Sequence, residues 1–397
     1  MAINIIKFLK NPADEEADTM EAKIRLHNKT KLYRTSLIII VLLLVGLLIK
    51  IQYDRHVYTD YDVLSSMTFD TPSGATFVRL KDCILTYSKD GAHCTDSSGN
   101  VVWNQTYEIQ DVIMDINENV VAIGSYNGRE IYVADNKSLL GTITTNMPIK
   151  SIAVASNGNV SCVLTDTDVT WINTYSKDGE LLFTGTSHMQ NSGYPASFAL
   201  SPSGNIMAVG YVYIDALTSK TNIAFYNYSD VGDNYNDRLV SAYEYPDVLV
   251  PQISFMGEQT AFAVGDNRLM FYKGSQKPTL ESTVLIDEEI KAVFNNNEYV
   301  GLMFNSEDPE HKYRFDVYNS KAKLLNSFYL DIDYTDVFFT KDIFVAYNAT
   351  ECFVSKINGR KKFEGSFDKG VNLMLPTGSS YRFLLVTDET AEIIQMK

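Results

Sequence analysis

Residues 172–185 read INTYSKDGELLFTG, two largely apolar runs separated by Ser-Lys-Asp-Gly. A similar stretch, LTYSKDGAHC, occupies residues 85–94. Asp and Gly favour the tight turns that join neighbouring antiparallel strands. Each stretch therefore predicts a β-hairpin, and the recurrence of the pattern indicates a repeated structural unit.

Hairpin patterns of this kind continue along the chain from residue 75 in two interleaved series. The first series has eight turns, about 40 residues apart, at Lys81-Asp82, Asn117-Glu118, Asn157-Gly158, Ser203-Gly204, Met256-Gly257, Asn295-Asn296, Lys341-Asp342 and Thr377-Gly378. The second series, which includes the stretch at 172–185, has seven members, at 94–103, 133–143, 174–183, 225–240, 270–282, 316–328 and 354–366. An eighth member begins at 391–397 and stops before its turn.

Four short strands in every 40 residues or so are typical of a β-propeller blade, which buries its two faces against neighbouring blades. The last unit lacks one strand, so we expect DVLSSMTFD at 62–70 to supply the outermost strand of that blade. The sequence thus predicts an all-β, eight-bladed propeller over residues 62–397, closed by its N- and C-terminal strands. A seven-bladed ring stays open as an alternative, because one misassigned hairpin would change the count.

Residues 37–49, LIIIVLLLVGLLI, contain no polar side chain. With their flanks they reach the length that a membrane-spanning helix needs, which predicts a transmembrane signal anchor over residues 35–53. A signal-peptide core or a buried helix is the alternative, but no small-residue cleavage site follows. The remaining expected segments are a cytoplasmic tail over 1–34, helical from residue 14, and a linker over 54–61.

The charges around this span predict its orientation. Lys23, Arg25, Lys29, Lys31 and Arg34 precede the span, whereas only Lys50 and Arg55 follow it closely. Because basic residues stay in the cytoplasm, we expect a single-pass protein of the cell membrane with its N-terminus inside and the bulk of the chain extracytoplasmic. Residues 56–397 carry 25 basic and 43 acidic residues, which argues against nucleic acid and against docking on anionic lipids.

The cysteines and histidines suggest no metal site and no catalytic centre. Cys83, Cys94, Cys162 and Cys352 are too scattered for a metal motif, and whether Cys83 pairs with Cys94 stays open. We find no GxSxG, HExxH or GxxxxGK[ST] pattern. The expectation is a non-enzymatic protein without cofactor or metal.

Four unusually long connections stand out, at 186–194, 215–220, 245–251 and 307–312. Three of them border or belong to the fourth unit. Function concentrates on such loops when a rigid scaffold holds them. The expected binding residues are therefore His188, Tyr194, Asp215 and Tyr245, since Tyr and His offer amphipathic contact area.

A short basic tail, one span and an acidic propeller with ALSPSGNIMAVG (199–210) and NTYSKDGELLFTG (173–185) together resemble a family of membrane-anchored propeller proteins of clostridial bacteria, classed as a domain of unknown function. The resemblance covers the full length. More distantly the blades look like WD40-type and quinoprotein-type propellers. The chain departs from the WD40 pattern, because it has only Trp103 and Trp171 and no Gly-His to Trp-Asp pairing, so no partner or cofactor carries over.

These observations favour an extracytoplasmic propeller that binds or scaffolds a protein or an envelope polymer at the cell envelope. One alternative is a propeller that binds or cleaves cell-wall polymer or a small ligand. Another is a single-span sensor, although the span lacks the GxxxG pattern of helix dimers.

Overall fold

The computed structural model describes residues 20–68, 74–166, 169–188, 193–215, 218–379 and 381–397. The chain divides into two compact units, Met1–Val57 and Tyr58–Lys397. The first 19 residues of the expected tail, and residues 69 and 70 of the expected closing strand, lie outside the described residues.

The first unit contains one long helix, α2 (Met20–Arg55). Its stretch His27–Gln52 is long and apolar enough to cross a membrane, by length and composition. The helix expected in the tail and the expected span therefore form one continuous element. The linker expected over 54–61 is shorter, because Arg55 is still helical and Tyr58 already packs within the second unit.

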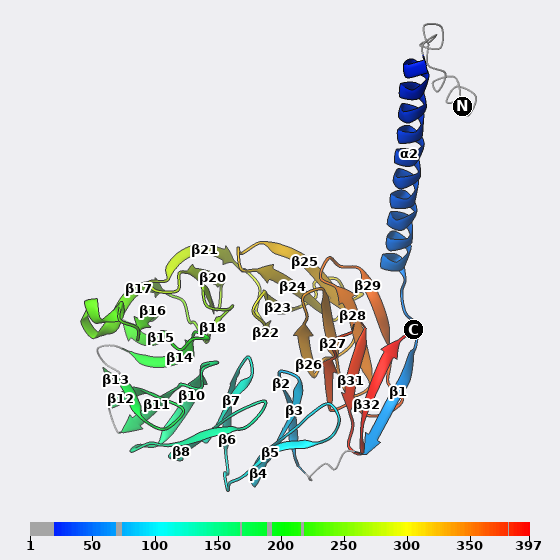
Figure 1. Ribbon diagram of the computed structural model, residues 1–397. Helices are drawn as coiled ribbons and strands as arrows, with labels where there is room; N and C mark the ends of the chain where they lie inside the picture. The colour runs from blue at the N-terminus through cyan, green and yellow to red at the C-terminus, as the bar shows by residue number, and fades with distance from the viewer. Residues whose placement is uncertain (1–19, 69–73, 167–168, 189–192, 216–217, 380) are drawn as a thin grey trace. The chain divides into compact units, whose positions relative to one another are not determined.

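The second unit is a ring of eight four-stranded antiparallel sheets (Figure 1). The seven-bladed alternative is therefore wrong. Blade 1 consists of β2 (Thr76–Leu80), β3 (Cys83–Tyr87), β4 (Gly91–Thr95) and β5 (Val101–Thr106), and blade 2 consists of β6 (Val112–Asn117), β7 (Val120–Ser125), β8 (Glu130–Asp135) and β9 (Leu139–Thr144). Blade 3 consists of β10 (Ile149–Val154), β11 (Val160–Asp166), β12 (Val169–Tyr175) and β13 (Leu181–His188). Blade 4 consists of β14 (Tyr194–Leu200), β15 (Ile206–Asp215), β16 (Thr218–Asn227) and β17 (Leu239–Pro246).

Two short 3-10 turns, η2 (Gly232–Asn234) and η3 (Asn236–Arg238), lie between β16 and β17. Blade 5 consists of β18 (Gln252–Phe255), β19 (Thr260–Val264), β20 (Arg268–Lys273) and β21 (Thr279–Leu285), and blade 6 consists of β22 (Ala292–Asn295), β23 (Tyr299–Asn305), β24 (Tyr313–Asn319) and β25 (Leu324–Leu330). Blade 7 consists of β26 (Asp336–Phe339), β27 (Ile343–Tyr347), β28 (Glu351–Lys356) and β29 (Lys361–Ser366). Blade 8 consists of β30 (Leu373–Pro376), β31 (Arg382–Val386), β32 (Thr390–Met396) and β1 (Tyr61–Thr68).

Blade 8 contains strands from both ends of the propeller. β1 pairs antiparallel with β32, from Tyr61 opposite Met396 to Thr68 opposite Thr390, with a bulge after Val63. The strand expected over 62–70 is thus observed as β1. This pairing covers the edge of β32 and completes the four strands of blade 8, so the chain ends lie in one sheet.

The first strand of each blade is innermost, because first strands of neighbouring blades contact each other around the axis, as β6, β10, β14 and β18 do. Alternating strand directions then define two faces. The turn face carries the turns that join the first to the second and the third to the fourth strands. The loop face carries the second-to-third loops and the links between blades.

The eight turns predicted for the first hairpin series are all confirmed on the turn face. In three of them a glycine has the positive φ that the turn requires, 91° at Gly158, 73° at Gly204 and 71° at Gly257. The two similar stretches of the sequence take different places in the blade. Residues 85–94 form the second-to-third hairpin of blade 1, whereas residues 172–185 form the third-to-fourth hairpin of blade 3.

The core consists of eight separate clusters of buried residues, one at each blade interface. For example, Phe344 of blade 7 stacks on Phe328 of blade 6 with ring centroids 4.5 Å apart. A four-stranded sheet has apolar residues on both faces here, so each blade is stable only between two neighbours.

All four cysteines are buried free thiols. Cys83 on β3 and Cys94 on β4 lie on neighbouring strands within the cluster between blades 1 and 2. Burial is the main cause that raises the pKa of both thiols. The pairing that the sequence left open is therefore absent from this structure.

Candidate functional site

The four residues expected to form a binding patch belong to the loop-face ends of blades 3 and 4. His188 ends β13, Tyr194 begins β14 and Asp215 ends β15, while Tyr245 lies near the end of β17. His188 is exposed and Tyr194 is half-buried. The side chain of Asp215 and the connections 189–192 and 216–217 lie outside the described residues.

Tyr245 does not belong to a surface patch. Only 8% of the residue is exposed, and its hydroxyl lies 2.7 Å from that of Tyr272 in the cluster between blades 4 and 5. Side chains along β17 alternate between the two faces of the sheet, and the Tyr245 ring lies on the face that packs against blade 5. Sequence reasoning placed it at the start of the 245–251 connection, whereas it belongs to β17, and could not tell which side of that strand faces the core.

Tyr194 lies near a tyrosine that the sequence did not single out. Burial raises the pKa of Tyr194, and the neighbouring Tyr126 adds to the shift. Tyr126 follows β7, and the Lys150 ammonium lies 4.8 Å from the centre of its ring. Lys150 also donates a hydrogen bond to Asn127 Oδ1 at 2.6 Å. Tyr126, Lys150 and Tyr194 thus connect blades 2, 3 and 4 on the loop face.

A cavity of about 660 Å³ opens around the axis at the turn-face ends of the first strands. Residues from blades 1 to 7 line it, and polar groups predominate. The polar lining comprises Arg79, Lys81, Asp115, Asn117, Glu118, Asn119, Ser254, Asn295, Asn296, Asn297, Glu298 and Lys341, and the aromatic lining comprises Phe198, Phe255 and Phe339. Such a surface offers both signs of charge together with amide donors and acceptors.

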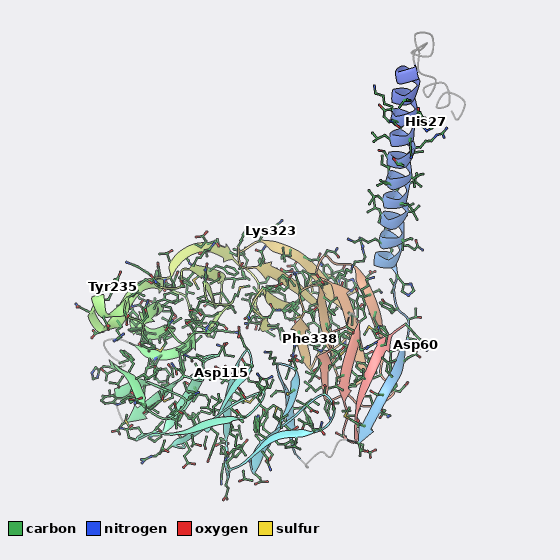
Figure 2. The ribbon with its side chains drawn as sticks, in the orientation of Figure 1. His27, Asp60, Asp115, Tyr235, Lys323 and Phe338 are labelled. Atoms are coloured by element: carbon green, nitrogen blue, oxygen red, sulfur yellow. The ribbon has the colours of Figure 1, made fainter. Side chains whose placement is uncertain are left out.

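Asp115 contributes a carboxylate to the lining of this cavity. It belongs to β6 and lies inside the ring (Figure 2). It accepts a 2.7 Å hydrogen bond from the backbone N–H of Val154 on β10 of the next blade. Burial raises its pKa to about 6, although N–H donors from Val154 and Ile116 partly oppose the shift. Asp115 therefore changes its charge close to neutral pH.

Two turns meet at the turn-face end of this cavity. Asn297 Nδ2, in the turn after β22, donates a 3.2 Å hydrogen bond to Glu118 Oε1, in the turn after β6. These turns belong to blades 6 and 2, which are four positions apart in a ring of eight and therefore lie on opposite sides of the axis. The bond bridges the channel at this end.

Hydrogen bonds also tie neighbouring first turns together around the rim of the cavity. Ser156 donates to Asn117 Oδ1 at 2.9 Å, and Asn157 donates to the Ser203 carbonyl at 2.7 Å. Ser203 in turn donates to Glu258 through its backbone N–H and its hydroxyl, at 2.9 and 2.5 Å. Blades 2 to 5 thus hold their turns in one fixed arrangement, which favours a preformed site.

Among the described residues, no group of three or more His, Cys, Asp and Glu side chains is placed to hold a metal ion. The described lining of the cavity contains neither histidine nor cysteine. The groups present can hydrogen-bond a polar ligand and balance its charge.

Comparison with solved structures finds similar chains at low sequence identity. BamB from Moraxella catarrhalis is 11% identical with a TM-score of 0.49, over 85% of this chain and all of BamB. The Pan2 WD40 domain of Neurospora crassa is 9% identical with a TM-score of 0.43, over 72% of this chain and 87% of that domain. Raptor from Chaetomium thermophilum is 11% identical with a TM-score of 0.44, over 87% of this chain and 29% of Raptor.

No curated protein matches the sequence. A family described only as being of unknown function does match, and the match covers residues 54–396, which include the whole propeller. The chain is therefore a member of this family of unknown function, DUF5711.

Proposed function

We propose that this protein is a membrane-anchored binding module whose loop face receives a protein with a basic surface. The observation that carries the proposal is the charge of the loop face around blade 6, in residues 286–291, 306–314 and 331–336. Nine carboxylates lie there, against four basic side chains, Lys291, His311, Lys312 and Arg314. The carboxylates are Asp287, Glu288, Glu289, Glu307, Asp308, Glu310, Asp331, Asp333 and Asp336.

Some of these carboxylates are held in local pairs. Arg314 donates to both oxygens of Glu288, at 3.1 and 2.7 Å, and Lys312 pairs with Asp333 at 3.2 Å. His311 Nδ1 lies 2.9 Å from Asp331 Oδ1, and that contact raises the pKa of His311. The surplus of negative charge remains exposed, and it would attract a basic partner and speed its association.

The membrane part of the proposal uses the charges around α2. The basic residues that precede the span favour an N-terminus in the cytoplasm, so the propeller would lie outside in a single-pass cell-membrane protein. Protease treatment of intact cells tests this orientation. Loss of the propeller with retention of the tail supports it, and full protection of the propeller contradicts it.

The binding part is tested by crosslinking in intact cells with two charge variants. Glu307→Gln/Asp308→Asn/Glu310→Gln removes three charges from the loop face, and Asp96→Asn/Asp178→Asn/Glu180→Gln removes three from the turn face as a matched control. We expect a crosslinked protein that is lost at high salt and in the loop-face variant alone. The acidic loop face would be refuted as the binding surface if the wild type and both variants captured the partner equally. It would also be refuted if both variants lost the partner to the same extent.

The cavity supports a second candidate function, the binding of a small polar ligand or the end of a cell-wall polymer. Asp115 and the amide-rich lining are the observation that favours it. A panel of sugars and wall fragments is screened for compounds that raise the melting temperature of the propeller but not of the Asp115→Asn variant. We propose binding rather than catalysis, and turnover of a fragment that Asp115→Asn abolishes would overturn that choice.

A further inference from the structure

The turn face of the propeller is divided into a basic and an acidic half along its outer rim. In blades 5, 6 and 7, the third-to-fourth turns and their bordering residues carry six exposed cations and no carboxylate. These cations, called here the basic rim, are Lys273, Lys277, Lys321, Lys323, Arg360 and Lys361. The corresponding turns and bordering residues of blades 1 to 4 carry seven carboxylates and only three cations.

The basic rim has few acidic neighbours. Lys361 pairs with Glu364 at 2.8 Å, and the Lys277 ammonium lies 5.4 Å from the ring centre of Tyr235. Glu258 and Glu298 belong to the first-to-second turns of blades 5 and 6, which lie nearer the axis than the basic rim. The positive surface is therefore confined to the periphery of these blades. Figure 2 shows Lys323 and Tyr235 at the periphery and Asp115 inside the ring.

Exposed apolar side chains accompany these cations. Leu280 and Leu324, near the start of the outermost strands of blades 5 and 6, are 40% and 44% exposed. Cations beside exposed leucines are the combination by which proteins bind the interface of an anionic membrane, where the cations meet phosphates and the leucines enter the acyl boundary.

The chain enters the propeller beside this rim. The Tyr58 backbone N–H donates a 2.7 Å hydrogen bond to the Lys362 carbonyl, next to Lys361. Only His56 and Val57 separate Tyr58 from Arg55, the last residue of α2. Lys361 of the basic rim therefore adjoins the residue that Tyr58 contacts, and Tyr58 follows the apolar helix by three positions. Two residues span at most about 7 Å.

We propose that the basic rim docks on the phosphates of anionic lipids, so that the turn face lies on the membrane and the loop face points away from it. This inference rests on the proposed membrane anchoring by α2. A short tether gives an effective concentration on the order of millimolar, so six weakly binding cations suffice to hold the propeller down. The negative charge of the whole propeller does not oppose docking, because most of it lies on the other face and is screened beyond about 10 Å.

The test uses the full chain in proteoliposomes and two matched labelling sites. Ser320→Cys lies in the third-to-fourth turn of blade 6, and Ser138→Cys lies in the corresponding turn of blade 2 on the opposite side of the ring. The four native thiols are buried, so a fluorophore attaches to the new cysteine alone. Nitroxide-headgroup lipids then quench a fluorophore that lies at the surface.

We expect strong quenching at residue 320 and weak quenching at residue 138 in phosphatidylglycerol-rich vesicles. High salt and pure phosphatidylcholine should both remove the difference. Lys273→Glu/Lys277→Glu/Arg360→Glu reverses the charge of the flanking turns and should lower the docked-to-undocked ratio more than about tenfold. Lys137→Glu/Lys177→Glu, in blades 2 and 3, should leave it unchanged.

Flotation of the same samples separates the two proposals. A chain that fails to float with the vesicles refutes the membrane anchor itself. A chain that floats, but shows equal quenching at residues 320 and 138 or no response to the charge reversals, retains the anchor and overturns the docking proposal.

Discussion

Blade 8 has one well-filled and one poorly filled interface. Fifteen buried residues form the cluster between blades 7 and 8, including Tyr58, Phe363 and Phe383. Among the described residues, only six are buried in the cluster between blades 8 and 1, and a cavity of about 430 Å³ lies beside them. The ring is therefore closed mainly by the pairing of β1 with β32 and by the contact with blade 7. The interface with blade 1, called here the seam, contributes less.

Removing β1 should have the largest effect on this arrangement. A chain that begins at Gly74 loses Tyr58 and the strand that covers β32, so the edge of blade 8 is exposed. We expect most of this protein to be insoluble, whereas a chain that begins at His56 should be soluble and fold cooperatively. Equal soluble yield and melting temperature for the two chains would show that β1 is dispensable.

Two adjacent leucines of β31 compare the interfaces directly. Leu385 belongs to the cluster with blade 7 and Leu384 to the seam, and each is 3% exposed. Leu385→Ala should lower the free energy of unfolding by about 3 to 4 kcal/mol, and Leu384→Ala by about 2 kcal/mol, because the seam already borders a cavity. Urea denaturation measures both, and an equal or larger loss for Leu384→Ala would reverse the ranking of the interfaces.

Cys352 reports whether the interface between blades 7 and 8 opens. Its thiol is fully buried and lies 3.8 Å from Met374 Sδ, and burial raises its pKa. In Leu385→Ala the alkylation rate of Cys352 should rise at least about tenfold, since local opening becomes easier. In Leu384→Ala it should stay at the wild-type rate. Cys162, between blades 2 and 3, is the internal control, and parallel acceleration at both thiols would indicate global unfolding instead.

Glu392 gives the smallest expected effect, at the pairing of β1 with β32. Burial alone would raise its pKa, but hydrogen bonds from Lys369, Thr390 and Ser66 outweigh burial and lower it. A lowered pKa stabilises the folded state above the ordinary value of 4.5, and this contribution is lost as the pH falls through the folded-state pKa. Glu392→Gln should therefore cost less than about 1 kcal/mol at pH 7. The difference in melting temperature should shrink as the pH falls below 4.5, and a difference that stays constant through acidification would exclude the ionic contribution.

Several features of the fold followed from local sequence alone. The eight first-series turns, the strand period and the strand supplied by residues near Met67 were predictable, because turn chemistry and short apolar runs act over a few residues. The same local character misleads in one place. Residues 85–94 and 172–185 share a turn sequence but join different strand pairs, since a turn does not encode its position in the blade.

The candidate sites depended on contacts that no local pattern announces. Tyr245 was expected at the surface, yet the pairing register of β17 directs its ring into the core. Glu118 and Asn297 are 179 residues apart in the sequence and meet only because eight blades place their turns across one axis. Net charge suggested a propeller that avoids anionic lipids, but a sum over residues cannot show that carboxylates gather on the loop face while exposed cations gather on one half of the turn face.

The sequence by itself therefore determined the strands, their turns, the apolar helix and the closed repeat, because propensity and alternation are properties of neighbouring residues. Only the tertiary structure decided which side chains are buried between blades, which turns meet at the channel and how charge divides between the faces. These features require the ring to close, and closure brings together residues that are hundreds of positions apart in the chain.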